Sequence, residues 1–529
     1  MNGWDELKAA ALAGRLDRRE FLMRSAALGV TAALSSGVLS SGALAAATPT
    51  KGGTLKLGLA GGSTTDSLDV RTYTDTVAFN VGYQLMNGLI EIDPKNKPTP
   101  ELLESWNVEP GAKKWVFKVR QGITFHNGKT LDAEDILYSL NLHRGDSKSP
   151  MVGPLKNITD VKASDKNEIT IELAEGDADL LYVLADYHLL VVPKDFNDWS
   201  KPIGTGAYEL EAWEPGVRSA VKRAKGDYWK PGRGNVDGIE ITVINDAAQR
   251  MNALVTGQVD MIHRVDSKAI DLLKSAPGIE LIQAPGGYHY ILSMFCDTAP
   301  FNNKDLRLAL KYAIDREQVL KTLLNGYGSL GNDHPIPKGD PFYNTQLEQR
   351  AYDPDKAKFH LGKSGLAGSK IALSASDAAF SGAVDMAVLF QATAAKAGVP
   401  ISIKKEPADG FWDNVWLKAP FVTSYWGGRP AATQMLTIAY KSDAAWNDTH
   451  WREPSFDKLL SDAKGETDEA KRKQYIWEMQ AMLHEDGGGL IPVFQDWLEA
   501  HSSKVKGHVP SSYFDNNGGR LGEMAWIEG

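Results

Sequence analysis

The spacing of apolar side chains is clearest in residues 115–120 and in the segment that follows them. Alternate positions in 115–120 carry Trp, Phe and Val, which predicts a strand with one buried face. Gly122 breaks this pattern, and the His-Asn-Gly run at 126–128 predicts a tight turn. Asp132 then precedes acidic residues and an apolar stripe at 136, 137 and 140, which predicts a capped amphipathic helix.

Other segments show the same two periodicities. Strands are predicted over 54–59, 169–173, 239–243 and 491–494, with a further one ending at 191–193. Helices are predicted over 78–89 and 246–255, and one more from the face formed by Leu306, Ala309, Leu310, Ala313 and Ile314. This mixture of strands and helices indicates an α/β protein.

The first 47 residues have the composition of an export signal. Adjacent Arg18 and Arg19, followed by Phe and Leu, resemble the twin-arginine signal pattern, and residues 26–44 are only mildly apolar. Small residues at 43–47 suit signal cleavage, and no Cys lies near them to carry a lipid. We therefore expect twin-arginine export to the periplasm without a lipid anchor. The alternative is a buried N-terminal helix with a coincidental arginine pair.

Composition narrows the class of the remaining protein. About 480 residues stay after removal of a signal, which is too many for one hydrophobic core and predicts two or three lobes. The net charge of the full chain is −9, and no basic cluster interrupts the acidic surface. An acidic surface disfavours nucleic acid and anionic membranes as partners.

The residues that carry chemistry form no catalytic or metal-binding motif. Cys296 is the single cysteine and lies in an apolar run, where a buried filler is favoured over a nucleophile. The eleven histidines are scattered, and neither His-Glu-x-x-His nor Gly-x-Ser-x-Gly occurs. We expect no catalytic residues, no metal site and no cofactor.

Five motifs follow one another in the order of a known family. They are residues 115–140, the Gly-Thr-Gly-Ala-Tyr run at 204–208, Arg223 with Tyr228-Trp229, the Gly-Gln-Val-Asp turn at 257–260, and residues 301–316. Their residues and their order along the chain resemble those of the peptide/nickel/opine-binding proteins of bacterial extracellular solute-binding family 5. Ala207 departs from the family pattern, which has Pro at that place.

This resemblance implies a periplasmic-binding-protein type II (Venus-flytrap) fold with two α/β lobes and an extra inserted lobe. Lobe I would comprise 48–92, 205–284 and 492–529, lobe II 93–204, and lobe III 285–491. Hinges are expected near Gly286 and Leu490, where glycine runs supply backbone freedom.

The function implied is that of the periplasmic binding component of an ABC importer. It would capture peptides or peptide-like and amino-acid-conjugate solutes, opines among them, and deliver them as a monomer to permease subunits of the inner membrane. Two alternatives stay open: a periplasmic hydrolase, and a nickel- or haem-binding member of the same fold.

A run of aromatic residues between 411 and 446 predicts the wall of the ligand site. In peptide-binding relatives an Asp in this region neutralises the α-ammonium of the peptide, whereas Arg429 stands at the corresponding place here. Arginine binds carboxylates and phosphates, so either the ligand presents an acid group or Arg429 forms a structural ion pair. The loop 63–66 is expected to face Arg429 from lobe I. The predicted ligand-binding residues are Ser63, Thr64, Thr65, Asp66, Tyr288, His289, Thr423, Tyr425, Trp426, Gly427, Gly428, Arg429, Trp446 and Gln495.

Overall fold

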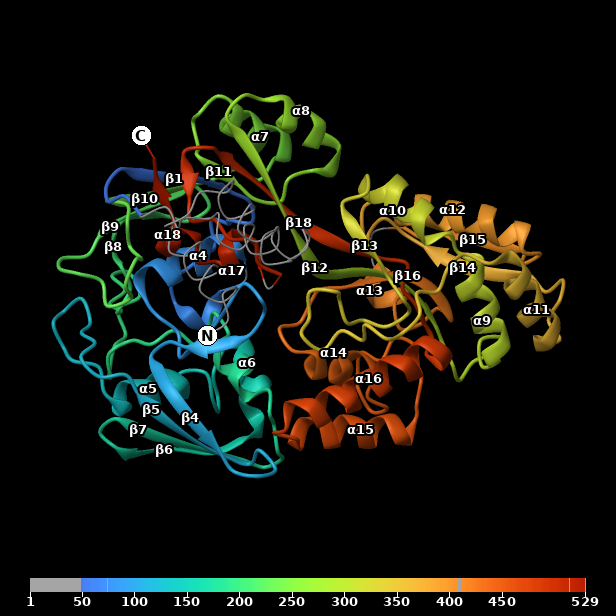
Figure 1. The fold of residues 1–529 in the computed structure, drawn as a ribbon, viewed down its shortest axis with the longest axis horizontal. Helices are drawn as coiled ribbons and strands as arrows, with labels where there is room; N and C mark the ends of the chain where they lie inside the picture. Colours follow the sequence, from blue (N-terminus) through green and yellow to red (C-terminus); the bar gives the residue numbers. More distant parts are fainter. Residues whose placement is uncertain (1–48, 74, 408–410, 513, 529) are drawn as a thin grey trace, which may run out of the picture. The chain divides into compact units, whose positions relative to one another are not determined.

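A twelve-stranded mixed sheet is the scaffold of the described chain, which comprises residues 49–73, 75–407, 411–512 and 514–528 of this computed structural model. The strand order is β15-β14-β16-β12-β18-β11-β1-β10-β9-β8, with β13 beside β18 and β17 beside β12 (Figure 1). The strands are β1 (Thr54–Leu59), β8 (Tyr208–Glu214), β9 (Arg218–Arg223), β10 (Gly238–Val243), β11 (Met261–Ile262), β12 (Ile279–Met294), β13 (Gly328–Leu330), β14 (Ile371–Ala375), β15 (Ile401–Lys405), β16 (Phe421–Trp426), β17 (Gly489–Leu490) and β18 (Val493–Ser502).

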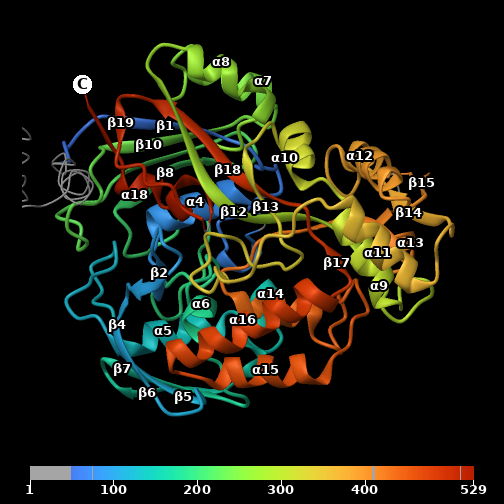
Figure 2. The same ribbon diagram turned by 45° about the vertical axis from the view of Figure 1, so that its right-hand side comes forward.

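Strand β12 belongs to both halves of this sheet. Its first part, from Ile279 to Ala284, pairs with β18, and its last part, from His289 to Met294, pairs with β16. A β-bulge separates Ala284 from Tyr288. Strands β12 and β18 therefore connect the β1 side of the sheet to the β14 side, as two views show (Figures 1 and 2).

Close backbone contacts require the glycines of this bulge. A Cβ on Gly286 would lie 2.3 Å from the carbonyl oxygen of Gln495, and one on Gly287 would lie 2.8 Å from the Cα of Gly428. Glycine permits this approach because it has no side chain. The hinge expected near Gly286 and Leu490 stays a prediction.

The β1 side of the sheet forms the core expected for lobe I. Strand β1 runs parallel to β10 and β11, and Leu55, Leu57 and Leu59 are fully buried in the core. The alternation that predicted a strand over 54–59 is thereby confirmed. The helices of this part are α4 (Thr76–Leu85), α7 (Ala247–Val255), α8 (Ile270–Ser275), α17 (Asp515–Gly518) and α18 (Leu521–Met524), and a small sheet pairs β19 (Val505–Lys506) with β20 (Trp526–Ile527).

A separate antiparallel sheet lies within the residues expected for lobe II. Trp115, Phe117 and Val119 of β5 point into its core, as their alternation predicted. The helix predicted after Asp132 is also confirmed, since the Asp132 carboxylate accepts from the N–H of Glu134 at 3.1 Å and closes a capping box with Asp135. The elements are β4 (Leu103–Val108), β5 (Lys114–Val119), β6 (Ile158–Asp165), β7 (Glu168–Leu173), α5 (Ala133–Asn141) and α6 (Leu180–Leu184), with β2 (Ile90–Ile92) paired to β3 (Pro98–Pro100) nearby.

The β14 side carries two cores within the residues expected for lobe III. In one core, helices pack on the parallel pair β14-β15. The other core is formed around α14 (Ala432–Tyr440), α15 (Pro454–Gly465) and α16 (Glu469–Asp486), which lie together in Figure 2. The remaining helices of this side are α9 (Lys304–Ala313), α10 (Arg316–Leu324), α11 (Pro354–Ser364), α12 (Ala383–Lys396) and α13 (Phe411–Asn414).

Hydrophobic cores cross the predicted boundary between lobes I and II. Leu89 and Ile90 pack in the core of the β5 sheet, whereas Leu190 and Val192 pack in the core of β1. Residues 51–529 form one compact unit. Lobe I, lobe II and lobe III denote the ranges predicted from the sequence, and their boundaries stay a prediction.

Most predicted elements are present, and three predictions were wrong in detail. The helix expected over 78–89 ends at Leu85, because Met86 is extended and the Asn87 amide donates to Glu101 at 3.0 Å. Residues 191–193 are not a strand, since only an isolated bridge from Gly88 to Leu190 forms there. Ile314 is buried but lies beyond the end of α9 in an extended conformation.

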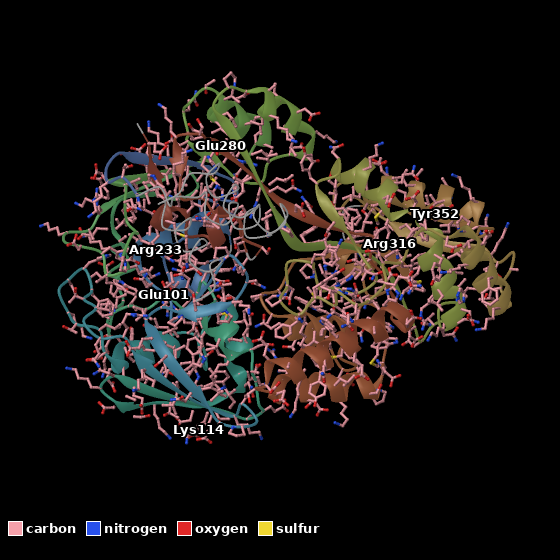
Figure 3. All side chains as sticks on the ribbon, in the orientation of Figure 1. Glu101, Lys114, Arg233, Glu280, Arg316 and Tyr352 are labelled. Atoms are coloured by element: carbon pink, nitrogen blue, oxygen red, sulfur yellow. The ribbon has the colours of Figure 1, made fainter. Side chains whose placement is uncertain are left out.

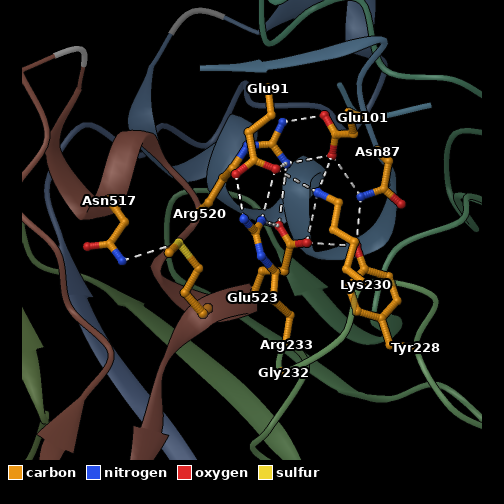
Figure 4. Close-up of polar contacts among 12 residues, drawn as sticks. Asn87, Glu91, Glu101, Tyr228, Lys230, Gly232, Arg233, Asn517, Arg520 and Glu523 are labelled. Atoms are coloured by element: carbon orange, nitrogen blue, oxygen red, sulfur yellow. Dashed lines mark hydrogen bonds and ion pairs between the residues drawn. The ribbon is translucent and has the colours of Figure 1, made fainter. Parts of the chain in front are cut away.

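A buried ion cluster joins distant segments at the junction of lobes I and II (Figure 4). Arg520 donates to Glu101 at 2.7 Å, and Arg233 donates to Glu91 at 2.7 Å. Figure 3 places Glu101 and Arg233 near each other and Arg316 on the β14 side. The cluster contains three acids and three bases, namely Glu91, Glu101, Glu523, Lys230, Arg233 and Arg520.

Candidate ligand-binding site

A row of aromatic side chains runs along β12 and β16 and extends to α13 and to loops near these strands. Neighbouring rings lie close, for example Tyr290 and Phe380 at 3.8 Å and Tyr288 and Tyr425 at 4.8 Å between centroids. The aromatic row consists of Phe380, Tyr290, Tyr288, Tyr425, Trp412, Trp416, Trp446 and Trp426.

Part of the aromatic row is open to solvent. Trp446 is 52% exposed, Trp412 39% and Tyr425 36%. Large aromatic side chains rarely gather at a water-exposed surface unless they contact a ligand or partner. The row is therefore the strongest candidate for the wall of a binding site.

The strand register divides the predicted site residues between two faces. His289 lies opposite Trp426 and Tyr290 lies opposite Tyr425, so these two pairs project to opposite sides of the sheet. Trp426 is only 5% exposed and belongs to the core around α14. Tyr425 and Trp426 therefore leave β16 on opposite faces, and ring contacts of Trp412, Trp416 and Trp446 connect them around the end of the strand.

His289 lies behind the row rather than in it. Its side chain is fully buried, its Nδ1 lies 3.1 Å from the carbonyl oxygen of Gly287, and its ring packs on Phe494. Burial lowers the pKa of His289 to about 4, so the ring is neutral at physiological pH. In this conformation a ligand that touches Tyr288 would not reach His289.

Asp448 accepts hydrogen bonds from two tryptophans at the Trp426 end of the row, and the sequence did not single it out. Its Oδ2 accepts from Trp416 Nε1 at 3.2 Å, from Trp426 Nε1 at 3.3 Å and from Ser293 Oγ at 2.9 Å. Burial raises the pKa of Asp448 to about 6. The signal in the sequence was one acidic residue close to Trp446 in an aromatic-rich region.

The end of β16 pairs with a neighbouring strand on one side only. Strand β14 pairs with β16 only through Ser374 and Val422, whereas β12 pairs with it as far as Trp426. Among the described residues, Thr423–Trp426 therefore have a strand neighbour on one side only. Thr423 and Ser424 are fully buried, so a ligand can reach this edge only near Tyr425, which is 36% exposed.

Arg429 stands just beyond this edge. Its Nη1 donates to the carbonyl oxygens of Gly427 and Gly428, both at 3.0 Å. No carboxylate lies within 4.0 Å of Arg429 in the described part of the chain, so the structural ion pair considered from the sequence is not seen there. Burial lowers the pKa of Arg429 from its usual value without removing its charge.

The two predicted glycines differ in their surroundings. A Cβ on Gly428 would lie 3.0 Å from the Cα of Gly287, so that side of Gly428 is filled by β12. A Cβ on Gly427 would have only the Arg429 Nη1 as a near neighbour, at 3.6 Å. An added Cβ would therefore have more space at Gly427, although Gly428 is the more exposed of the two residues.

A cavity of about 530 Å³ adjoins the other end of the aromatic row. The predicted residues Tyr288 and Gln495 line it, together with Arg264, Tyr290 and Ser381, which the sequence did not single out. The cavity is bordered by residues 264–268 of lobe I and by α10 and α12 of lobe III, and so spans both predicted lobes.

The loop 63–66 closes on itself. The N–H of Ser63 donates to the Asp66 carboxylate at 2.8 Å, and the N–H of Asp66 donates to the Ser63 carbonyl at 3.0 Å. Ser63, Thr64 and Thr65 are exposed. No hydrogen bond joins this loop to Arg429 in the described structure, and their expected opposition stays a prediction.

The described residues contain no group of three or more His, Cys, Asp or Glu side chains arranged to hold a metal ion. Burial raises the pKa of the Cys296 thiol to about 11, so the residue is a neutral thiol. Within the same residues, no helix is long and apolar enough to span a bilayer.

Comparison with known proteins confirms the resemblance seen in the motifs. Residues 97–448 match the family described as bacterial extracellular solute-binding proteins, family 5 Middle. Di/tripeptide-binding protein 1 of Pseudomonas aeruginosa is 26% identical over 442 residues, which cover 74% of this chain and 79% of that protein.

Solved structures confirm the fold class. HbpA2 of Haemophilus parasuis superimposes with a TM-score of 0.80 at 21% identity, over 90% of this chain and 100% of that one. The periplasmic binding protein AgaA of A. tumefaciens R10, in complex with agropinic acid, has a TM-score of 0.70 at 25% identity, over 90% and 99% of the two chains. The predicted type II periplasmic-binding-protein fold is therefore present.

Proposed function

Since this chain belongs to family 5 of the bacterial extracellular solute-binding proteins, which serve ABC importers, we propose that it captures carboxylate-bearing peptide-like or amino-acid-conjugate solutes. Opines are included in this class. The observation that carries the proposal is Arg429, a cation without a carboxylate partner in the described chain, placed three residues after the end of β16 and near the exposed Tyr425.

Each part of the surface has a separate task in this proposal. The backbone from Tyr425 to Gly428 binds the backbone or amide groups of the ligand, and the exposed rings of the aromatic row pack on its side chains. Arg429 binds the acid group through two parallel N–H donors. A relative named for di- and tripeptides and a structural neighbour that holds agropinic acid support this ligand class.

Binding would act through a shift between open and closed states. A ligand that contacts both lobes stabilises the closed state by the difference between its affinities for the two states. The closed protein would then deliver the ligand to permease subunits as a monomer exported to the periplasm. No specific observation in the described residues favours the hydrolase or the nickel- or haem-binding alternative.

Native mass spectrometry of gently purified protein is the first test, because tightly bound ligands often remain through purification. Calorimetry with defined di- and tripeptides and opines then measures affinity. Each peptide is compared with its C-terminal amide, which lacks the carboxylate but keeps the rest of the molecule. The proposal predicts at least tenfold weaker binding of the amides, and equal binding of acids and amides would contradict it.

A further inference from the structure

Lobe II contacts lobe III at a site remote from the connecting strands β12 and β18. Helix α6 lies next to the ends of α14, α15 and α16 in both views (Figures 1 and 2). The N–H of Ala178 donates to the Lys464 carbonyl oxygen at 2.6 Å, and Asn96 Nδ2 donates to the Pro430 carbonyl oxygen at 3.2 Å. These bonds join segments separated by several hundred residues.

The centre of this contact is a buried polar group. Asp179 forms an ion pair with Arg472 and accepts a hydrogen bond from the Thr433 hydroxyl. The side chains of Asp179 and Arg472 are 1% and 8% exposed. Around them, Lys464 lies 3.9 Å from Asp177, and Lys97 lies 3.8 Å from Glu469.

The contact reaches the loop that carries Arg429. Pro430 follows Arg429 directly, and Thr433 lies in the first turn of α14. Asn96 therefore binds this loop at Pro430, and Asp179 binds the helix that follows it at Thr433. Asn96 is itself held by the Tyr182 hydroxyl, which donates to the Asn96 carbonyl oxygen at 2.9 Å.

We propose that lobe II is a latch for the ligand site, in which Asn96 and Asp179 are positioning residues that hold the Arg429 loop and favour the closed arrangement. This inference rests on the proposed function, because it assigns Arg429 to ligand binding. Neither Asn96 nor Asp179 needs to touch the ligand. Ligand affinity would thus depend on a lobe outside the β12–β16 surface.

The physical basis is the difference between the two arrangements. In the arrangement of this structure, in which lobes II and III are in contact, the Asp179 carboxylate compensates the buried charge of Arg472. Removing one member of a buried pair leaves the other charge unpaired, and that penalty is relieved when the contact opens and water enters. Asp179→Asn should therefore shift the population towards the open arrangement.

The latch is tested without a ligand by measuring the distance between lobes II and III. Spin labels are placed at Lys166→Cys and Ser461→Cys, both exposed positions, in a Cys296→Ser background. Wild type should show a population at the distance given by this structure. Asp179→Asn and Arg472→Met should each move at least half of it to longer distances.

Asp160→Asn is the matched control, since it neutralises an acid of the same lobe whose pair with Lys162 is exposed. It should leave the distances unchanged. Asn96→Asp is a second, independent variant: it replaces the amide donor by an acceptor and tolerates the positive φ of 59° at this position. Circular dichroism checks that every variant is folded.

Calorimetry with trialanine as the probe connects the latch to the ligand site. Asp179→Asn and Asn96→Asp should weaken binding at least fivefold, whereas Asp160→Asn should not. The latch proposal would be overturned if the distances were unchanged in folded Asp179→Asn protein. It would also be overturned if wild type lacked the population at the short distance even with trialanine present.

Failure of wild type to bind any acid of the peptide panel would instead contradict the proposed function. The distance measurement without ligand would then still test the latch.

Discussion

Arg429 is a half-buried cation whose donors meet only the carbonyl oxygens of Gly427 and Gly428 in the described chain. If it binds a ligand acid, Arg429→Ala should cost about 2–5 kcal/mol of affinity, because the acid loses its buried partner. Arg429→Lys should recover only part of this, since a point charge replaces a planar fork. Calorimetry with the ligand found by mass spectrometry measures both.

The melting temperature of ligand-free protein is the control for this prediction. It should barely change in Arg429→Ala, because no ion pair of the described structure is lost. A lower melting temperature with normal affinity would show that Arg429 is structural.

Asp340 should make stability depend on pH. Burial, assisted by the nearby charge of Asp179, raises the pKa of Asp340 from 3.8 to about 7. Between these values the folded protein holds a proton that the unfolded chain has released, so this residue's contribution to stability is full below pH 4 and lost as pH rises through 7. Asp340→Asn should therefore stabilise the protein at pH 8, by roughly 2–4 kcal/mol at about 1.4 kcal/mol per pKa unit, and hardly at pH 4.

Melting temperatures of wild type and Asp340→Asn across this pH range test the prediction. Asn keeps the side-chain oxygen that accepts from the Phe342 N–H at 2.7 Å. Asp443→Asn is the control, because Asp443 is 74% exposed. Parallel pH curves for wild type and Asp340→Asn would show that Asp340 is ionised in the folded protein.

At the scale of elements, β12 and the loop after β16 depend on a contact between two glycines. A Cβ on Gly287 would lie 2.8 Å from the Cα of Gly428, a backbone atom that would have to shift to make room for it. Gly287→Ala should therefore destabilise the protein by about 1–3 kcal/mol, the usual cost of overpacking. Thermal unfolding measures the effect.

Gly362→Ala provides the comparison, because Gly362 lies inside α11 and a Cβ added there would have no neighbour within 4 Å. Alanine stabilises a helix interior by roughly 0.5–1 kcal/mol relative to glycine. Equal effects of the two substitutions would mean that the β12 contact is not tight.

At the scale of the whole molecule, the buried ion cluster joins the end of the chain to lobe II. Arg520 and Glu101 are 4% and 0% exposed and lie 419 residues apart. Arg520→Met should cost about 3–5 kcal/mol of stability, since it leaves three buried carboxylates with only two cations to compensate them. Arg218→Met, which breaks an exposed pair with Glu214, should change stability by less than about 1 kcal/mol.

Export is a prediction about residues outside the described structure. Arg18→Lys combined with Arg19→Lys should retain the precursor in the cytoplasm, because the twin-arginine route depends on the arginine pair. Cell fractionation with antibody detection measures this. A normal periplasmic yield from the double variant would refute the assignment.

The sequence by itself determined the local elements and the family. The strand at 114–119 and the cap at Asp132 depend on side-chain periodicity and on hydrogen bonds within a few residues, and both signals are visible in a linear chain. The ordered motifs from residue 115 to residue 316 indicated the family that the comparison then confirmed.

Only the tertiary structure decided which of the predicted site residues share a surface. Strand register placed Tyr288 and His289 on opposite faces of the sheet. Tertiary packing brought Asp448 into contact with two tryptophans, and it brought Asn96 into contact with Pro430, 334 residues away. Such contacts leave no periodic signal, because each side chain is compatible with many partners until the sheet and its connections fix the distance between them.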